Sequence, residues 1–280
     1  MRRQRTAWLV LILVALLHTL FTLWRGSFAP QLSAYASPAP VQSAGPDARQ
    51  NTVAAPAHGY IEASFAARMR ALRPTILAAA ARHNHPAVSG LSDTQFAATM
   101  AQLLYNEHNG WFEDEVPLIR QLTPLYQQVQ QGANETGLGS NFSVWPSNLR
   151  PSVALEILAR EVPLPAGKGA LAVPISVMGS SINQHVYPSR RALLAAITAE
   201  LADERLAVEY LAANLERGVY RARYEGAPIT WRTLAAWHNG GITLPIDIAA
   251  NTRTDGYVKR AALYLAAAHE LIEGAYARGR

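Results

Sequence analysis

Apolar residues recur at helical spacing along most of the chain that follows residue 60. In the stretch 60–83, four of them follow one another at intervals of four, three and four positions: Phe65, Met69, Leu72 and Ile76. These intervals are typical of one face of an α-helix. Pro74 lies within the stretch and is expected to kink or divide the helix.

A second helix is expected to begin after Ser92. The tetrapeptide 92–95, Ser-Asp-Thr-Gln, has the form of a capping box, with Ser92 as the N-cap and Gln95 as the third helical residue. This helix should run to about His108, because the Asn-Gly pair that follows favours a stop.

The remaining periodic segments predict five more helices. They cover about 116–131, 151–160, 189–217, 230–238 and 255–273. The long helix is expected to end at Gly218, and a loop rich in Gly and Asn is expected over 132–141. The segment 161–188 could be a loop or a short hairpin, and periodicity does not decide between them. The fold class is therefore predicted to be mostly α.

The N-terminus has the pattern of a membrane-targeting segment. Arg2, Arg3 and Arg5 precede an apolar run from Ala7 to Trp24, which at about 1.5 Å per residue nearly spans a hydrocarbon core of about 30 Å. Residues 1–26 are therefore an uncleaved signal anchor, or a signal peptide cleaved near the Ala-Tyr-Ala sequence at 34–36. Either way, the arginines predict a cytoplasmic N-terminus and an extracytoplasmic domain, anchored by a single pass in the cell membrane or secreted after cleavage.

The segment 27–58 is rich in Pro, Ala, Ser and Gln. A segment of this composition cannot bury enough apolar surface to fold, so a disordered, flexible linker is expected. The folded helical domain is then predicted to occupy 59–280.

Composition narrows the classes of partner and of chemistry. The chain has no cysteine, which excludes disulfides and thiolate chemistry, and its net charge of +5 suits an anionic polymer or an anionic membrane surface. Nucleic acid is not an expected partner, since lysine occurs only at Lys168 and Lys259 and no basic run is present. No cofactor or metal is expected either, because the pair His83 and His85 is more typical of a solvated turn before Pro86.

Glu107 is the candidate for catalysis that the helical pattern indicates. It lies eleven positions after Phe96, which at about 100° per residue returns it to within about 20° of that residue, on the stripe that contains Met100 and Leu103. Burial and the C-terminal end of the helix dipole should both raise its pKa. A neutral carboxylic acid near pH 7 is what protonation of a glycosidic oxygen requires. The alternative is a solvated glutamate at the end of the helix.

Several aromatic residues fall near the predicted helix ends and loops: Tyr105, Trp111, Trp145, Trp231, Trp237 and Tyr257. Aromatic faces of this kind bind sugar rings in glycan grooves. The alternative for each is ordinary packing in or beside the core.

Four segments, in this order, resemble the lysozyme-like lytic transglycosylase domain of the soluble lytic transglycosylase type. The segment from 70–74 through Ala-Gln-Leu-Leu-Tyr-Asn-Glu at 101–107 is similar to the family's entry helices and its catalytic helix. The others are Phe-Ser-Val-Trp-Pro-Ser at 142–147, Ala-Val-Glu-Tyr-Leu at 207–211, and Leu-Ala-Ala-Trp-His-Asn-Gly at 234–240 followed by Thr-Arg-Thr-Asp-Gly-Tyr-Val at 252–258. The chain departs from the family at His108, Ser143 and Trp237, where the family has Ser, Gln and Tyr.

The resemblance implies a two-lobed helical domain that binds peptidoglycan glycan strands in a groove. It further implies cleavage of the β-1,4 bond between N-acetylmuramic acid (MurNAc) and N-acetylglucosamine (GlcNAc), with Glu107 as the general acid and then the base. The substrate-binding residues it implies are Tyr105, His108, Ser143, Trp145, Trp237, Asn239 and Tyr257. Two alternatives remain: a hydrolase in which Asp114 or a neighbour positions water, and a membrane-tethered glycan-binding or scaffold module without activity.

Overall fold

A computed structural model describes residues 59–109, 127–135 and 141–274. The predicted membrane segment (1–26), the linker (27–58), Trp111 and Asp114 lie outside the described residues. No helix in the described part of the chain is both long and apolar enough to cross a membrane.

Helix α4 (Asp93–Asn109), which contains Glu107, packs most extensively against α2 (Ala63–His83) and α12 (Leu265–Glu273). The short α3 (Pro86–Ser89) lies between α2 and α4 in the sequence. The predicted capping box is confirmed: the backbone N–H of Gln95 donates to Ser92 Oγ at 3.1 Å, and that of Ser92 donates to Gln95 Oε1 at 2.8 Å. Pro74 lies inside α2 and does not divide it.

The middle of the chain forms a short helix and a hairpin. Helix α6 (Pro151–Leu158) leads into β1 (Glu161–Pro163), which pairs antiparallel with β2 (Ala170–Ala172) around a 3₁₀ turn at Pro165–Gly167. Of the two alternatives for 161–188, the hairpin is therefore present at the start of the segment. The prediction of a loop over 132–141 is wrong at its beginning, since residues 127–135 form a helix.

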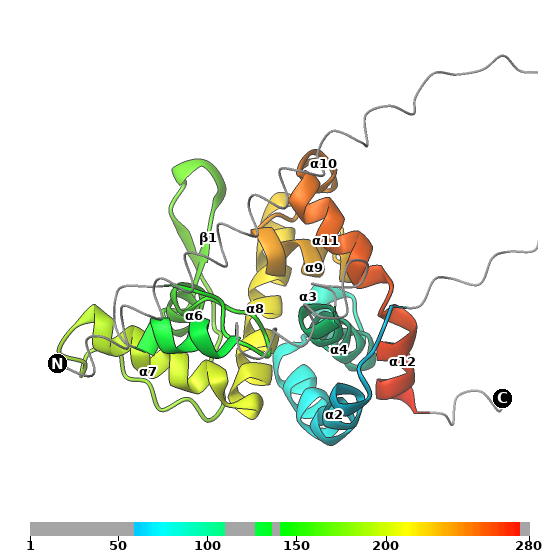
Figure 1. Ribbon diagram of the computed structural model, residues 1–280. Coiled ribbons are helices and arrows are strands. Elements are labelled where there is room, and N and C mark those ends of the chain that lie inside the picture. The colour runs from blue at the N-terminus through cyan, green and yellow to red at the C-terminus, as the bar shows by residue number, and fades with distance from the viewer. Residues whose placement is uncertain (1–58, 110–126, 136–140, 275–280) are drawn as a thin grey trace, which may run out of the picture. The chain divides into compact units, whose positions relative to one another are not determined.

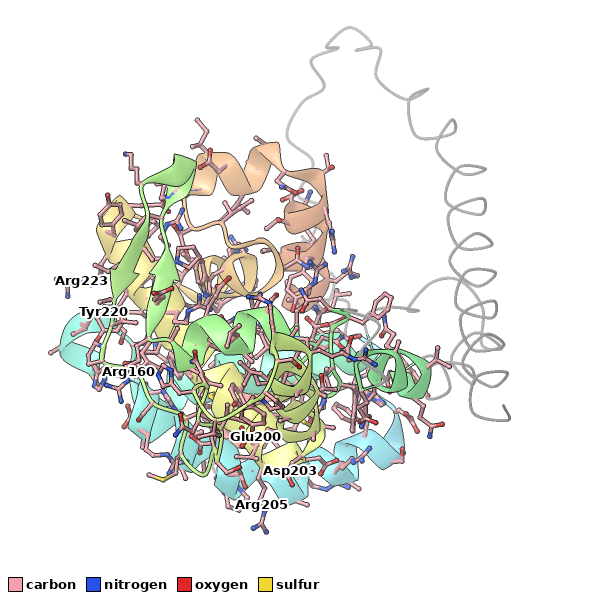
Figure 2. The ribbon with its side chains drawn as sticks, turned by 90° about the vertical axis from the view of Figure 1, so that its left-hand side faces the viewer. Arg160, Glu200, Asp203, Arg205, Tyr220 and Arg223 are labelled. Atoms are coloured by element: carbon pink, nitrogen blue, oxygen red, sulfur yellow. The ribbon has the colours of Figure 1, made fainter. Side chains whose placement is uncertain are left out.

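The predicted long helix over 189–217 is two helices. They are α7 (Arg190–Ala202) and α8 (Glu204–Glu225), and Asp203 between them caps α8 through its carboxylate (Figure 2). Gly218 does not end the helix, because α8 continues to Gly226, whose φ of 67° ends it. A Cβ at Gly218 would lie 2.6 Å from Cδ1 of Trp237, so this glycine permits close packing of the indole.

The C-terminal part contains one more helix and one more break than the periodicity predicts. After α9 (Trp231–Gly240) come α10 (Pro245–Ala250) and α11 (Thr252–Ala262), and α12 follows a break at Leu263 and Tyr264. The predicted helix over 255–273 is thus α11 and α12. Asn251 caps α11, its side chain accepting from the N–H of Thr254 at 3.0 Å.

Helix α8 joins two buried apolar clusters. Its residues Val208 and Leu211 belong to the first cluster, which includes the buried faces of α2, α4 and α12. Its residues Tyr210 and Ala213 belong to the second, which includes those of α6, α7 and the hairpin. Figure 1 shows α6 and α7 on one side of α8 and α2 and α4 on the other. The prediction of a mostly α fold is confirmed.

Candidate active site

Glu107 lies in the last turns of α4, and its surface is 6% exposed. The other members of its stripe, Phe96, Met100 and Leu103, are fully buried. The helical spacing therefore places the carboxylate on the buried face of the helix, and the alternative of a solvated glutamate does not fit.

Donors from three separate segments converge on the Glu107 carboxylate. The Tyr257 hydroxyl on α11 donates to Oε1 at 2.5 Å, and Nε2 of His238 on α9 lies 3.2 Å from the same oxygen. Nδ2 of Asn148, in the turn before α6, donates to Oε2 at 2.6 Å. Each donor is far from Glu107 in sequence, by 41 residues for Asn148 and 150 for Tyr257. The tertiary fold alone brings them together.

The turn at 145–148 aims Asn148 at the carboxylate. A bridge between Val144 and Leu149 closes the turn, and the N–H of Val144 donates to the carbonyl of Leu149 at 2.9 Å. Asn148 has a φ of 51°, in the left-handed region that asparagine tolerates better than most residues. The asparagine therefore serves both the backbone of the turn and the bond to Glu107.

The pKa of Glu107 lies below its ordinary value, not above it as the position on the helix predicts. Burial, the largest single influence, raises the pKa. The hydrogen bonds of His238, Tyr257 and Asn148, together with the charge that His238 carries when it is doubly protonated, outweigh burial. Helical periodicity predicts that the carboxylate is buried but carries no information on these donors. The donors decide whether the pKa of Glu107 is raised or lowered.

Tyr257 is held as a neutral donor. Burial first, and then the charge of Glu107 and the hydrogen bond to it, raise the pKa of the phenol well above its ordinary value. Asn106 acts in the opposite sense by bonding to the phenol. The hydroxyl therefore keeps its proton and donates a hydrogen bond to the Glu107 carboxylate.

His108, next to Glu107 on α4, belongs to a separate aromatic group. Its ring stacks on Phe65 with centroids 3.7 Å apart, and Nδ1 accepts from the Trp145 indole N–H at 3.2 Å. Nε2 lies 2.9 Å from a carboxylate oxygen of Glu62. Burial is the main influence on the pKa of His108 and lowers it. An imidazole that accepts at Nδ1 and donates at Nε2 is neutral, in agreement with that direction.

Trp145 retains a partly exposed ring beside this group. The guanidinium of Arg68 lies 4.4 Å from the ring centroid, and Arg68 also pairs with Glu204. Of the predicted sugar-binding aromatics, Trp145 is one that the described structure leaves accessible.

Two of the other predicted site residues lie in the core. Tyr105 is 4% exposed and packs on Phe65 and Tyr264, and Trp237 is 5% exposed with its indole N–H bonded to the carbonyl of Asn214 at 2.8 Å. Neither ring presents an open face against which a sugar could stack in this structure. Asn239 is partly buried and accepts from Thr254 Oγ1 at 3.5 Å, and Ser143 is partly exposed at the start of the turn that carries Asn148.

Sequence reasoning did not single out Asn148 and His238 as site residues. A signal existed for both: His238 lies inside the quoted segment 234–240, and Asn148 directly follows the quoted segment 142–147. Within the described ranges, no group of three or more His, Asp or Glu side chains could hold a metal ion.

Comparison with known proteins finds no relative of this chain: no protein-family model, no curated protein and no solved structure matches it.

Proposed function

We propose that this protein is an extracytoplasmic peptidoglycan-cleaving enzyme of the lytic transglycosylase type, with no cofactor. It would cleave the β-1,4 bond between MurNAc and GlcNAc, with Glu107 as general acid and then as base. The observation that carries the proposal is the convergence on one buried carboxylate. Two of the four segments on which the sequence resemblance rests supply these residues: the first contains Glu107, and the last contains both His238 and Tyr257. Asn148 directly follows a third segment, 142–147.

The two buried clusters support the lysozyme-like, two-lobed arrangement that belongs to this proposal. One cluster lies on each side of α8, and the bonds to Glu107 come from the turn before α6 as well as from α9 and α11. A glycan strand bound along this boundary would pass beside Asn148 and the accessible ring of Trp145.

The proposed reaction needs one carboxyl group and no water. Protonated Glu107 gives its proton to the glycosidic oxygen while the bond from that oxygen to C1 of MurNAc breaks. The carboxylate then takes the proton of the C6 hydroxyl of the same sugar while O6 bonds to C1. The products are a GlcNAc hydroxyl end and a 1,6-anhydro MurNAc end, and Glu107 is protonated again.

The lowered pKa of Glu107 sets a condition on this reaction, because a resting carboxylate must gain a proton before it can act as an acid. Asn148 offers a physical route, since its side chain is partly exposed and its amide N–H could turn from Oε2 of Glu107 to a hydroxyl or N-acetyl oxygen of the glycan. Burial already acts to raise the pKa. Loss of the Asn148 donor on substrate binding would therefore raise the pKa of Glu107.

The test is Glu107→Gln, assayed on purified peptidoglycan with product analysis. We expect cleavage to fall by at least about 10²–10⁴-fold, the usual contribution of general acid–base catalysis, and the wild type to leave anhydro ends. Glu200→Gln is the matched control, because Glu200 is a buried carboxylate that accepts from Ser180 and Tyr210 in the second cluster. Full activity of Glu107→Gln, or equal losses in both variants, would refute the assignment. Reducing ends in place of anhydro ends would identify a hydrolase.

A glycan-binding module without activity is the second candidate, and the pKa of Glu107 is the observation that favours it. A carboxylate held ionised by donors of the protein's own chain can serve to join α4, α9 and α11 rather than to transfer protons. This candidate is the correct one if the wild type binds peptidoglycan in a sedimentation assay but releases no product from several wall preparations.

The proposed location follows from the arginine-flanked apolar run at 7–24. The domain would lie outside the cytoplasmic membrane, anchored by that run or released from it. Protease added to intact spheroplasts should then degrade the domain, and degradation only after the membrane is broken would contradict the location.

A further inference from the structure

Asn214 lies behind His238 on the side away from Glu107. It is on α8, is 2% exposed, and its Nδ2 is 3.5 Å from Nδ1 of His238. The other ring nitrogen of His238 faces Glu107. The proton positions on the imidazole therefore depend on which atom Asn214 presents to it.

Arg217 determines how the Asn214 amide is turned. Its Nη1 donates to Oδ1 of Asn214 at 3.1 Å. A guanidinium has donors and no acceptor, so the atom that faces it must be the amide oxygen and not the NH₂ group. The NH₂ group is thereby directed toward His238.

The orientation of Arg217 is itself fixed by neighbouring elements. Its Nε donates to the carbonyl of Glu161 in β1 at 2.7 Å, and its Nη2 pairs with Glu156 of α6 at 2.5 Å. Arg217 is 1% exposed, and burial is the main influence on its pKa and lowers it. A buried guanidinium with partners on three elements has little freedom to release Asn214.

The NH₂ group of Asn214 requires an acceptor, so Nδ1 of His238 must carry no proton. The neutral imidazole then has its proton on Nε2, where it can be donated to Oε1 of Glu107 at 3.2 Å. In the other neutral tautomer, the proton on Nδ1 would face the NH₂ group of Asn214, so that two donors would meet. The lone pair on Nε2 would face the Glu107 carboxylate, so that two acceptors would meet. A doubly protonated ring would also oppose the NH₂ group of Asn214.

We infer that Asn214 is a positioning residue that, held by Arg217, keeps His238 neutral with its proton on Nε2, so that His238 donates a hydrogen bond to Glu107. The charged and titratable groups placed around His238 are Glu107 on α4, Tyr257 on α11 and, beyond Asn214, Arg217 on α8. The contribution to catalysis rests on the proposed function, whereas the proton positions on His238 do not.

The test is Asn214→Asp in the full-length protein, studied in detergent with ¹⁵N-labelled histidine. Aspartate has the same shape and can keep the bond to Arg217, but it presents an acceptor to His238 in place of a donor. In two-bond ¹H–¹⁵N spectra at pH 7, wild-type His238 should show a protonated Nε2 and an unprotonated Nδ1. In Asn214→Asp, Nδ1 should be protonated as well as Nε2, because the aspartate accepts at Nδ1 while Glu107 accepts at Nε2. The chain has eight histidines, and His238→Gln assigns the signal.

Asn141→Asp is the control, because Asn141 bonds to the N–H and the hydroxyl of Ser152, both of which can donate to an aspartate, and Ser152 does not contact Glu107. It should leave the His238 signals unchanged. A wild-type His238 protonated at Nδ1, or the same pattern in Asn214→Asp as in the wild type, would overturn the inference.

Activity separates the inference from the proposed function. A protonated His238 beside Glu107 stabilises the carboxylate, so Asn214→Asp should lower kcat more than it changes KM and should move the alkaline limb of the kcat profile to lower pH. If the NMR pattern is as inferred but the wild type cleaves no glycan, the proposed function fails and the assignment of Asn214 to His238 stands.

Discussion

The hydroxyl of Tyr257 donates a 2.5 Å hydrogen bond to Oε1 of Glu107, joining α11 to α4 across 150 positions of the sequence. Both side chains are buried, and each affects the ionisation of the other. The carboxylate raises the pKa of the phenol, and the phenol helps to lower the pKa of the carboxylate. The pair therefore stabilises the fold while it sets the proton affinity of the proposed catalytic group.

Tyr257→Phe tests that coupling. Removing the hydroxyl deletes one donor to a buried carboxylate, so the pKa of Glu107 should rise. Stability at pH 7 should fall by about 1.5–3 kcal/mol, the range for hydrogen bonds to charged groups. Urea unfolding measures the stability. Titration of Glu107 followed by ¹³C NMR of its carboxyl measures the pKa. A variant as stable as the wild type, with an unchanged titration of Glu107, would show that the bond contributes little.

Glu107→Gln should destabilise the protein at neutral pH, apart from its effect on activity. A folded-state pKa below the unfolded value of about 4.3 means that the ionised form contributes stability above that pH. That contribution is lost as the pH falls through the folded value. We therefore expect the variant to be about 1–3 kcal/mol less stable at pH 7, with a smaller difference at pH 3. Unfolding by urea at both pH values is the measurement.

The exposed Glu135→Gln provides the baseline for that comparison. Glu135 bonds to Gln131 on the surface of its helix, so its replacement should change stability by less than about 0.5 kcal/mol. If Glu107→Gln were more stable than the wild type at pH 7, the lowered pKa would be wrong and burial would be the dominant influence.

Asn148→Gly removes the side-chain donor of Asn148 but preserves the backbone conformation of the turn. Glycine accepts the φ of 51° without strain but has no amide to offer Glu107. The pKa of Glu107 should rise. For a general acid, the alkaline limb of kcat/KM should then move to higher pH. Arg160→Gly is the matched control, since Arg160 also has a positive φ, of 59°, and it should leave the pH profile unchanged. A profile that moves in both variants, or in neither, would contradict the role of Asn148.

The secondary structure could be predicted where a local signal exists. The capping box at Ser92 gave the start of α4, and the apolar stripe gave the burial of Glu107. The break between α7 and α8 has no such signal, because Asp203 caps α8 within a helical periodicity that continues on both sides of it. Gly218 has the same sequence signal as a glycine that ends a helix, and only its contact with Trp237 identifies it as a packing glycine.

The candidate residue, Glu107, could be predicted from the sequence, but the electrostatic environment of its carboxylate could not. Glu107 is found from periodicity and resemblance. The lowered pKa, in contrast, depends on Asn148 and His238, whose contact with Glu107 is created by tertiary folding. The same limit explains why Trp237, an aromatic near a helix end, lies in the core: nothing local to α9 reveals that α8 covers it.

Gly218→Ala tests whether that packing supports the site. Alanine favours a helix by about 1 kcal/mol over glycine, but its Cβ would meet Cδ1 of Trp237 at 2.6 Å and Cγ at 2.8 Å. The indole must move, and overpacking of a core typically costs about 1–3 kcal/mol, so we expect a net loss of stability of up to about 2 kcal/mol. Gly256→Ala in α11 is the control, because nothing lies within 4 Å of the added Cβ, and it should be stabilising by about 0.5–1 kcal/mol. Since Trp237 immediately precedes His238 and bonds to Asn214, the Gly218 variant should also disturb the His238 signals, which the Gly256 variant should preserve. If Gly218→Ala were as stabilising as the control, the contact of α8 with Trp237 would be looser than the structure has it.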